Sequence, residues 1–448
     1  MYRLLFLQFL RSKAVRAGLL LTLLLGGISI GIGHQFLDQK NAAIDEVERY
    51  QKQHIERNVE LHKDDLGLLM YYLKFAFVNS PASLAGLSVG QSDINPIIQR
   101  ITIKNLEGQR YDTDLVNPMN LQSGNLDLSF VLIYLFPLLV IVFTFNLLSE
   151  ETETGTWRLV AVQAPSKRKY LLTKLSVRAV LVYAVLGILL IAAKIALSIP
   201  LDVNFMMVVL LSIVYIAFWF GVCFFVIAFN KGSHFNALLL LSTWLGLLML
   251  LPAGINAYIT NRYPIPEALT TMISQRDGYH TKWDMDKTET IKKFYGHYPQ
   301  FETFGYPTEG FNWTWYYAMQ QMGDDDARKD TEALWQKIRK RESVSKRVSA
   351  FLPNMHLQLA FNGLAGTGLG EQLDFLEATN AFHEELRLFF YPMVFKEVSG
   401  DRVDWTKFTP KYWSQNTEGE NPIRYLWPLL SAAFIVMLGC AVVFKRWY

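Results

Sequence analysis

The stretch "LSFVLIYLFPLLVIVFTFNLL", residues Leu128–Leu148, decides the fold class that this sequence predicts. It runs for 21 residues without a charged side chain. An apolar helix of about 20 residues is long enough to cross the hydrocarbon core of a bilayer. Five more apolar runs of this kind occur, at 17–33, 179–193 with an extension to about 199, 203–230, 235–261 and 425–444. We therefore expect a mainly α-helical membrane protein with six transmembrane helices.

Composition indicates that much of the chain also lies outside the bilayer. Hydrophobic residues make up 51% and charged residues 19% of the sequence, which is too apolar for an ordinary soluble protein. The mean hydropathy is nevertheless only +0.16. We expect a large, mixed but mostly helical extracytoplasmic domain built from two insertions, residues 37–127 and 262–424. The net charge of +3 gives no indication of a nucleic-acid partner.

The distribution of basic residues predicts the orientation of the chain. Lys and Arg gather at both termini and in the segments after the second and fourth runs, whereas the short loop around Asp202 has none. Because basic residues concentrate in cytoplasmic loops, we expect both termini in the cytoplasm. The basic start of the first run resembles a signal peptide, but we expect this run to be kept as an anchor.

These expectations divide the chain into five parts. They are an N-terminal amphipathic segment with the first span (1–36), a first insertion (37–127), spans two to five with a cytoplasmic helix at 149–163 (128–261), a second insertion (262–424), and the sixth span with a basic tail (425–448). Within the insertions, helical patterns occur at about 41–78, 266–293, 326–350 and 370–391, and "RITI" at residues 100–103 is typical of a strand.

Motifs of known enzymes are missing from the sequence. It contains no phosphate-binding G-x-x-x-x-G-K-[ST] loop, no H-E-x-x-H zinc signature and no G-x-S-x-G nucleophile elbow. "FHEEL" at Phe382–Leu386 lacks the second His of the zinc signature, and we interpret it as a solvated helix face. The spans are also nearly free of acidic residues, which disfavours an ion-coupled transporter. We expect a chain that is not itself catalytic, binds no metal, and receives energy from another subunit.

The loop after the second run, "SEETETGTWRLVAVQAPSKRKYLLTKL" at Ser149–Leu175, is unusually rich in charge. Ser149 is predicted to cap a short helix, whose first turn suits acidic residues. We expect the basic half of the loop to meet anionic lipid headgroups through Lys167, Arg168, Lys169 and Lys174. Anionic lipid would repel Glu150, Glu151 and Glu153, so these acids favour a docking protein. The alternative is an interfacial helix that only fixes topology.

This loop resembles the E-x-E-x-G-T signature of ABC-2-type transporter permeases, which continues into a proline and basic residues. The matching positions are Glu151, Glu153, Gly155, Thr156, Pro165, Ser166, Arg168 and Lys174. Four further segments, 79–96, 117–139, 273–278 and 361–378, resemble an uncharacterised bacterial branch of that family, which is known only as a domain of unknown function. The resemblance covers nearly the whole chain.

The resemblance implies partners and a location. Two permease subunits would pair, as a homodimer or with a paralogue, in the bacterial inner membrane. Each would bind a separate cytoplasmic ABC ATPase, which would hold the ATP and Mg²⁺, so that this chain needs no cofactor of its own. The coupling residues would be Glu150, Glu151, Glu153, Gly155, Thr156 and Trp157. Spans two and five would line the path between subunits, with pore or hinge residues at Pro137, Trp244, Pro252 and Gly254.

Two functions from different classes remain open on this evidence. In the first, the chain is the permease subunit of an exporter that moves or extracts a hydrophobic or amphipathic substrate. In the second, it transmits ATPase strokes mechanically to a periplasmic or envelope partner, without translocation. Familiar family members keep the segment between their first two spans small, whereas both insertions are large here, which suggests that the outside domain contacts a substrate or a periplasmic partner. A membrane-anchored enzyme is a third alternative, disfavoured by the missing motifs.

The second insertion contains a segment that is exceptionally aromatic. Eleven Phe, Tyr and Trp residues lie between Phe294 and Tyr317. We interpret them as the core of the outside domain. The alternatives are a groove for a lipid, peptide or glycan, and a partner interface.

Overall fold

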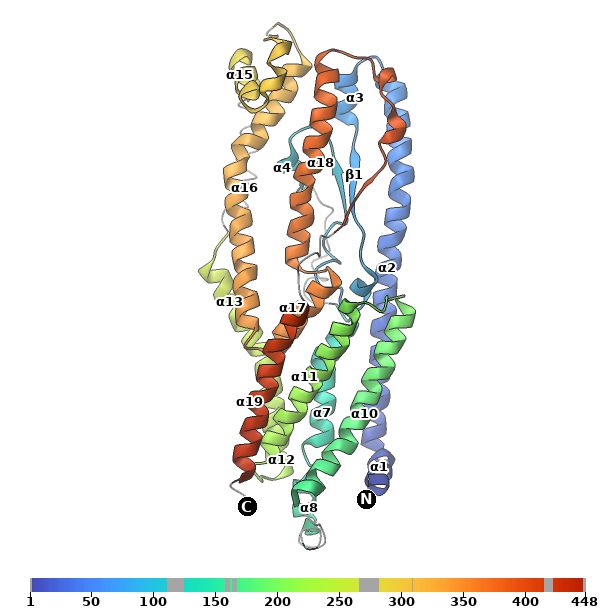
Figure 1. Ribbon diagram of the computed structural model, residues 1–448, viewed down its shortest axis with the longest axis vertical. Coiled ribbons are helices and arrows are strands. Elements are labelled where there is room, and N and C mark those ends of the chain that lie inside the picture. Colours follow the sequence, from blue (N-terminus) through green and yellow to red (C-terminus); the bar gives the residue numbers. More distant parts are fainter. Residues whose placement is uncertain are drawn as a thin grey trace.

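The computed structural model describes residues 2–110, 125–157, 162, 167–265, 282–307, 309–414 and 422–445. The molecule is long and mostly helical (Figure 1). Apolar helices form its lower half in this view, where the N-terminus, the C-terminus and α8 (Ser149–Glu153) lie at one end. The upper half contains long helices and a small sheet. The end that carries α8 and the part that contains the sheet, for which we keep the name outside domain, therefore lie opposite each other in the molecule.

Six helices among the described residues are long and apolar enough to cross a membrane, as the sequence predicts. The first span lies in α2 (Lys13–His62), and the third, fourth and sixth are α10 (Lys167–Ala196), α11 (Val203–Ile227) and α19 (Leu426–Lys445). The second consists of α6 (Leu128–Phe130), η2 (Val131–Leu135) and α7 (Phe136–Thr144), and the fifth of α12 (Ser233–Leu245), η3 (Gly246–Leu250) and α13 (Leu251–Arg262). Both chain ends lie at the same end of this bundle (Figure 1).

The centre of the bundle is α11, which packs against α7 and α19. Its largest side chains, Tyr215 and Trp219, are completely buried. Asp202 begins the helix by accepting a hydrogen bond from the backbone N–H of Phe205 at 2.8 Å, which satisfies one of the free amides of the first turn. The fifth span, by contrast, is the least buried of the six.

Helix α2 joins the membrane part to the outside domain without a break. Its 50 residues correspond to a length of about 75 Å. The boundary that the sequence suggested at residue 36 therefore falls inside a single helix. Near that point Gly33 touches the short helix η1 (Ser83–Gly86) so closely that a Cβ atom at Gly33 would lie 1.9 Å from the carbonyl oxygen of Gly86.

The outside domain contains a three-stranded sheet that joins the two insertions. Its order is β2 (Ile98–Ile101), β1 (Phe75–Asn79), β3 (Lys411–Trp413). Strand β1 runs antiparallel to β2 and parallel to β3, with Phe77 opposite Lys411. The predicted helix at 41–78 was wrong over its last residues, because Phe75–Asn79 pairs with both neighbours. The Phe77 ring stacks on Phe375 and Phe382, with centroids 5.4 and 5.3 Å away.

Helices surround this sheet and connect it to the bundle. They are α3 (Leu66–Tyr72), α4 (Leu106–Arg110), α15 (Lys287–His297), η4 (Pro299–Phe304), α16 (Trp313–Ser349), α17 (Pro353–Ala365), α18 (Leu369–Phe395), η5 (Gly400–Arg402), η6 (Trp405–Lys407) and η7 (Pro422–Tyr425). Helix α16 begins 13 residues before the predicted start, where Asn312 caps it by accepting from the Thr314 amide at 2.7 Å. Helix α17 was not predicted. Residues 266–281 of the predicted helix at 266–293 lie outside the described part.

The aromatic segment forms the core of the outside domain, as predicted. Seven of its eleven rings are buried: Phe294, Tyr295, Tyr298, Phe301, Trp315, Tyr316 and Tyr317. The Tyr317 hydroxyl donates to the carbonyl oxygen of Gly67 at 2.9 Å, so the ring also anchors α3. Tyr306 and Phe311 remain exposed. Most of the segment is therefore unavailable as an open groove.

The contact between Gly33 and Gly86 predicts a position-specific effect of alanine. We expect Gly33→Ala to lower the stability by about 1–3 kcal/mol, because the added methyl group forces the two backbones apart. Gly31→Ala is the matched control, since nothing lies within 4 Å of a Cβ there and alanine favours the helix. The apparent midpoint of thermal unfolding in detergent measures both. Equal midpoints for the two variants would contradict the close approach.

Candidate functional site

The charged loop after the second span folds into a short helix and a turn. Helix α8 covers Ser149–Glu153, and Gly155 follows in a left-handed conformation with φ of +76°. Thr152 and the residues up to Thr156 are exposed, whereas Trp157 packs against a small apolar cluster that includes Leu147 and Leu171. Residues 158–161 and 163 of the predicted helix at 149–163 lie outside the described part.

Ser149 does not cap this helix, contrary to the sequence-based prediction. The capping position is Leu148, which has no suitable side chain, and Ser149 is the first helical residue. Its hydroxyl is buried and lies 2.7 Å from the Ser233 hydroxyl at the start of the fifth span. Ser149 thus fixes α8 to α12 instead of satisfying the amides of α8.

Glu151 is turned into the protein. Its Oε1 atom lies 2.7 Å from Lys174 Nζ and accepts from the Tyr170 hydroxyl at 2.5 Å. Lys174 also donates to the carbonyl oxygen of Leu147 at 3.1 Å. The side chains of the ion pair are 14% and 11% exposed. Lys174, which the sequence assigned to lipid headgroups, is therefore bound within the chain, and it connects α8 to the third span.

Glu153 connects α8 to the fifth span. Its carboxylate accepts from the backbone N–H of Ser233 at 2.7 Å and from the Ser233 hydroxyl at 3.0 Å. This contact supplies an acceptor at the N-terminus of α12, where Gly232 offers no side chain. Glu150 is exposed and accepts from the Asn146 amide at 3.2 Å. All three glutamates thus have partners inside the chain, so their charge alone does not require a docking protein.

The surface of α8 that stays open to a partner is narrower than predicted. It consists of Glu150 and the residues from Thr152 to Thr156, which are exposed at the end of the bundle, whereas Glu151 and Trp157 are half-buried. Lys169 is exposed beside it, whereas the side chains of Lys167 and Arg168 lie outside the described part. The coupling and lipid-contact roles stay predictions.

The two prolines predicted as hinges each follow a π-helical turn. Segment η2 ends two residues before Pro137, and η3 ends two residues before Pro252. Because proline has no N–H, it cannot bond the carbonyl four residues earlier. For Pro137 this carbonyl belongs to Ile133, which accepts instead from the Tyr215 hydroxyl at 2.9 Å. Such π-helical turns often occur at functional sites.

Trp244 links the second and fifth spans. Its indole Nε1 donates to the carbonyl oxygen of Tyr134 at 3.1 Å, within the π-helical part of the second span. Gly254 lies in the exposed fifth span, and a Cβ atom there would meet nothing within 4 Å. The structure thus brings Trp244 and the helical turn before Pro137 together, and leaves Gly254 on an open face.

A polar network connects the membrane bundle to the outside domain; we call it the junction. Its centre is Asp127, which is 3% exposed. It accepts from the backbone N–H of Val89 at 2.8 Å, from that of Phe130 at 2.9 Å and from the Ser129 hydroxyl at 2.6 Å. Burial raises the pKa of Asp127, and these hydrogen bonds oppose part of that shift.

The junction continues to α17 and the turn that follows it. Ser88 donates to the side-chain oxygen of Asn362 at 2.8 Å, and Thr367 donates to the carbonyl oxygen of Ser88 at 2.8 Å. Gly90 has φ of +55° and lies so near Thr367 that a Cβ atom would come within 2.7 Å of the Thr367 carbonyl oxygen. Three segments that resembled one family in sequence therefore meet here, although nothing in the sequence predicted their contact.

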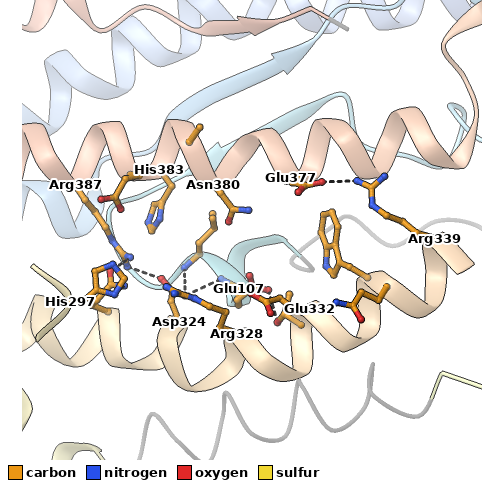
Figure 2. Close-up of a pocket in the computed structure, with 17 residues that line it drawn as sticks. Glu107, His297, Asp324, Arg328, Glu332, Arg339, Glu377, Asn380, His383 and Arg387 are labelled. Atoms are coloured by element: carbon orange, nitrogen blue, oxygen red, sulfur yellow. Dashed lines mark hydrogen bonds and ion pairs between the residues drawn. The ribbon is translucent and has the colours of Figure 1, made fainter. Parts of the chain in front are cut away.

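A polar cavity lies between α16 and α18 in the outside domain (Figure 2). Its volume is about 830 Å³. Arg387 on its wall is 2% exposed and bonds Asp324 and the carbonyl oxygen of Lys104, each at 2.8 Å. Arg339 near the other end pairs with Glu377 at 2.6 Å. These charges hold α16 against α18. The cavity was not predicted, because its residues come from separate segments.

His383 on the same wall corrects an interpretation made from the sequence. The motif "FHEEL" was expected on a solvated helix face, but His383 is 3% exposed and its Nε2 lies 2.7 Å from the carbonyl oxygen of Lys104. Phe382 is also buried. The helix turns this part of the motif toward the sheet, since Phe382 packs against Phe77.

The fold defines a helical membrane protein whose charged turn lies at one end of six spans and whose large domain lies at the other. Residues 84–219 match the family described as ABC-2 membrane transporter related, and residues 269–413 match a domain of unknown function, DUF3526. The first match covers the part of the chain from η1 into the fourth span, and the second lies between the fifth and sixth spans. No curated protein and no solved structure matches it.

The junction predicts a local effect of removing Asp127. In Asp127→Ala the buried amides of Val89 and Phe130 lose their acceptor, and unsatisfied buried groups cost about 1–3 kcal/mol each. We expect hydrogen exchange at residues 84–90 to become at least tenfold faster. Asn125→Ala is the control, because Asn125 reaches only the Gly90 carbonyl oxygen at 3.2 Å. Unchanged exchange in Asp127→Ala would show that this carboxylate does not hold the junction together.

Proposed function

We propose that this chain is the permease subunit of an ATP-driven exporter, and that a separate cytoplasmic ATPase docks on the exposed turn from Glu150 to Thr156. The observation that carries this proposal is the position of that turn at the end of the bundle, directly after the second span. The turn is joined to the third span through Glu151 and Lys174 and to the fifth span through Glu153 and Ser233. A force applied to α8 would therefore reach three spans.

The proposal has further parts that concern the membrane, the second subunit, the substrate and the partner ATPase. The membrane is the bacterial inner membrane, with both termini and α8 in the cytoplasm. A second permease subunit covers the fifth span, whose exposed side chains include the apolar Leu238, Leu241, Leu245, Met249 and Leu250. The substrate is hydrophobic or amphipathic and moves between spans two and five, near the contact of Trp244 with Tyr134. The partner ATPase binds ATP and Mg²⁺, and this chain catalyses no reaction.

Photo-crosslinking tests the docking surface directly. With a photoreactive amino acid in place of Thr152 in growing cells, we expect an adduct whose second component is an ATPase with a phosphate-binding loop, identified by mass spectrometry. Tyr412 is the control position, since it is 52% exposed on β3 at the opposite end of the molecule. Failure to obtain this adduct from Thr152, or an equal yield from Tyr412, would refute docking on α8.

A specific observation favours the second candidate function, mechanical transmission. Helix α2 passes from the first span into the outside domain, and the junction fixes the loop after η1 to the start of the second span. Movement of the spans would therefore be carried to the outside domain through a helix and a buried network. In this alternative the chain drives a periplasmic or envelope partner without translocating a substrate.

Distance measurements separate the two candidates. In the reconstituted complex we attach spin labels at Leu61→Cys in both subunits, because Leu61 is 63% exposed and the two native cysteines are buried. Mechanical transmission predicts that ATP changes the distance between labels, and that Asp127→Ala reduces this change while ATP hydrolysis continues. Equal distances with and without ATP, together with ATP-driven passage of an amphipathic probe across the vesicle, would exclude mechanical transmission and favour export.

A further inference from the structure

A second cavity lies at the end of the bundle that carries α8, beside the exposed turn, and Glu150, Thr154 and Thr156 of that turn contribute to its rim. Its volume is about 570 Å³, and α2, α7, α8, α10 and the N-terminal helix α1 (Tyr2–Arg11) enclose it. Phe9, Val142 and Phe143 contribute apolar walls. Its polar walls carry two acids and two bases, Glu150, Glu151, Lys174 and Arg178. The cavity is therefore amphipathic and has no net charge on its described walls.

Arg178 is an unusual member of this wall. It is 5% exposed, and its Nη1 atom is buried without a hydrogen-bond partner. No ion pair joins it to an acid in the part of the chain that the structure describes, and its guanidinium group lies over the Phe9 ring, 5.0 Å from the centroid. A buried guanidinium is costly unless an acceptor satisfies it. The site thus offers an unused cationic donor.

Glu151 supplies an unpaired hydrogen-bond acceptor in the same cavity. Its Oε1 atom is occupied by Lys174 and Tyr170, but its Oε2 atom is buried and has no hydrogen-bond partner. The two unused atoms therefore have opposite character: Arg178 Nη1 requires an acceptor, and Glu151 Oε2 requires a donor. Since no ion pair joins the two side chains, a ligand that carries both charges can bridge them.

We propose that this cavity binds the headgroup of a zwitterionic phospholipid that carries a primary ammonium group. The lipid phosphate accepts from Arg178, the ammonium group donates to Glu151, and the acyl chains lie against the apolar walls, beside Val142, which is 50% exposed. A simple anion would leave Glu151 Oε2 without a donor, and a simple cation would leave Arg178 Nη1 without an acceptor. The location at the end of six spans matches the depth of phospholipid headgroups.

Native mass spectrometry of the full-length protein tests this site. We incubate the wild type in detergent micelles with equal amounts of phosphatidylethanolamine, phosphatidylcholine and phosphatidylglycerol. We expect phosphatidylethanolamine to be retained about tenfold more than the others, since the choline group has no N–H and the glycerol headgroup has no cation. Equal retention of the three lipids would mean a non-specific annular lipid and would overturn the proposal.

Two variants test which side chain binds which group of the lipid headgroup. Arg178→Gln is expected to reduce phosphatidylethanolamine retention about tenfold, and Glu151→Gln to remove the preference over phosphatidylglycerol. Arg16→Gln is the matched control, because Arg16 is exposed on α2 and does not line the cavity. Retention by Arg178→Gln equal to that of Arg16→Gln would refute the site. If Arg178→Gln does not fold, the wild-type lipid comparison still decides the outcome.

Discussion

Inside a bilayer no water can satisfy a backbone carbonyl that lacks its helix donor. Pro137 creates this need at Ile133, in the middle of the second span, and the Tyr215 hydroxyl from the fourth span meets it. Trp244 of the fifth span donates to the next carbonyl, that of Tyr134. The irregular turn before Pro137 therefore orders three spans around itself. If the second span bends here, Tyr215 and Trp244 must move with it to keep these two hydrogen bonds. The positions of α11 and α12 therefore depend on the shape of the second span.

At the other end of the second span, side-chain contacts again hold neighbouring spans together, and here the acceptors are charged carboxylates. Lys174 of the third span and Ser233 at the start of the fifth span both donate to glutamates from one short helix. The acids that suggested an external partner are therefore structural as well. The proposed docking surface therefore does not depend on the inward-turned carboxylate of Glu151, and it includes the exposed Glu150 and the threonines of the turn. A charge reversal at Glu151 or Glu153 would disturb the bundle itself and would not isolate a docking contact.

The sequence predicted features that depend on local composition. The six spans follow from charge-free runs such as Leu128–Leu148, and the aromatic core follows from the density of rings after Phe294. Features that depend on distant pairing were not predictable. The strand at Phe75–Asn79 continues a helical pattern and is extended only because Ile98–Ile101 and Lys411–Trp413 pair with it. Likewise the orientation of Glu151 depends on Tyr170 and Lys174, 19 and 23 residues later, and the burial of His383 depends on Lys104.

The parallel pairing of β1 with β3 has a consequence for how the protein is made. Phe77 emerges early in synthesis, but its partner Lys411 follows more than 300 residues later. Four spans must be inserted between the two events, and both insertions must reach the same side of the membrane. The edge of the strand at Phe75–Asn79 that pairs with β3 therefore stays unpaired during synthesis, and unpaired strand edges are prone to aggregate. Until the segment before the sixth span has been synthesised, we expect chaperones on the domain's side of the membrane to bind the incomplete outside domain.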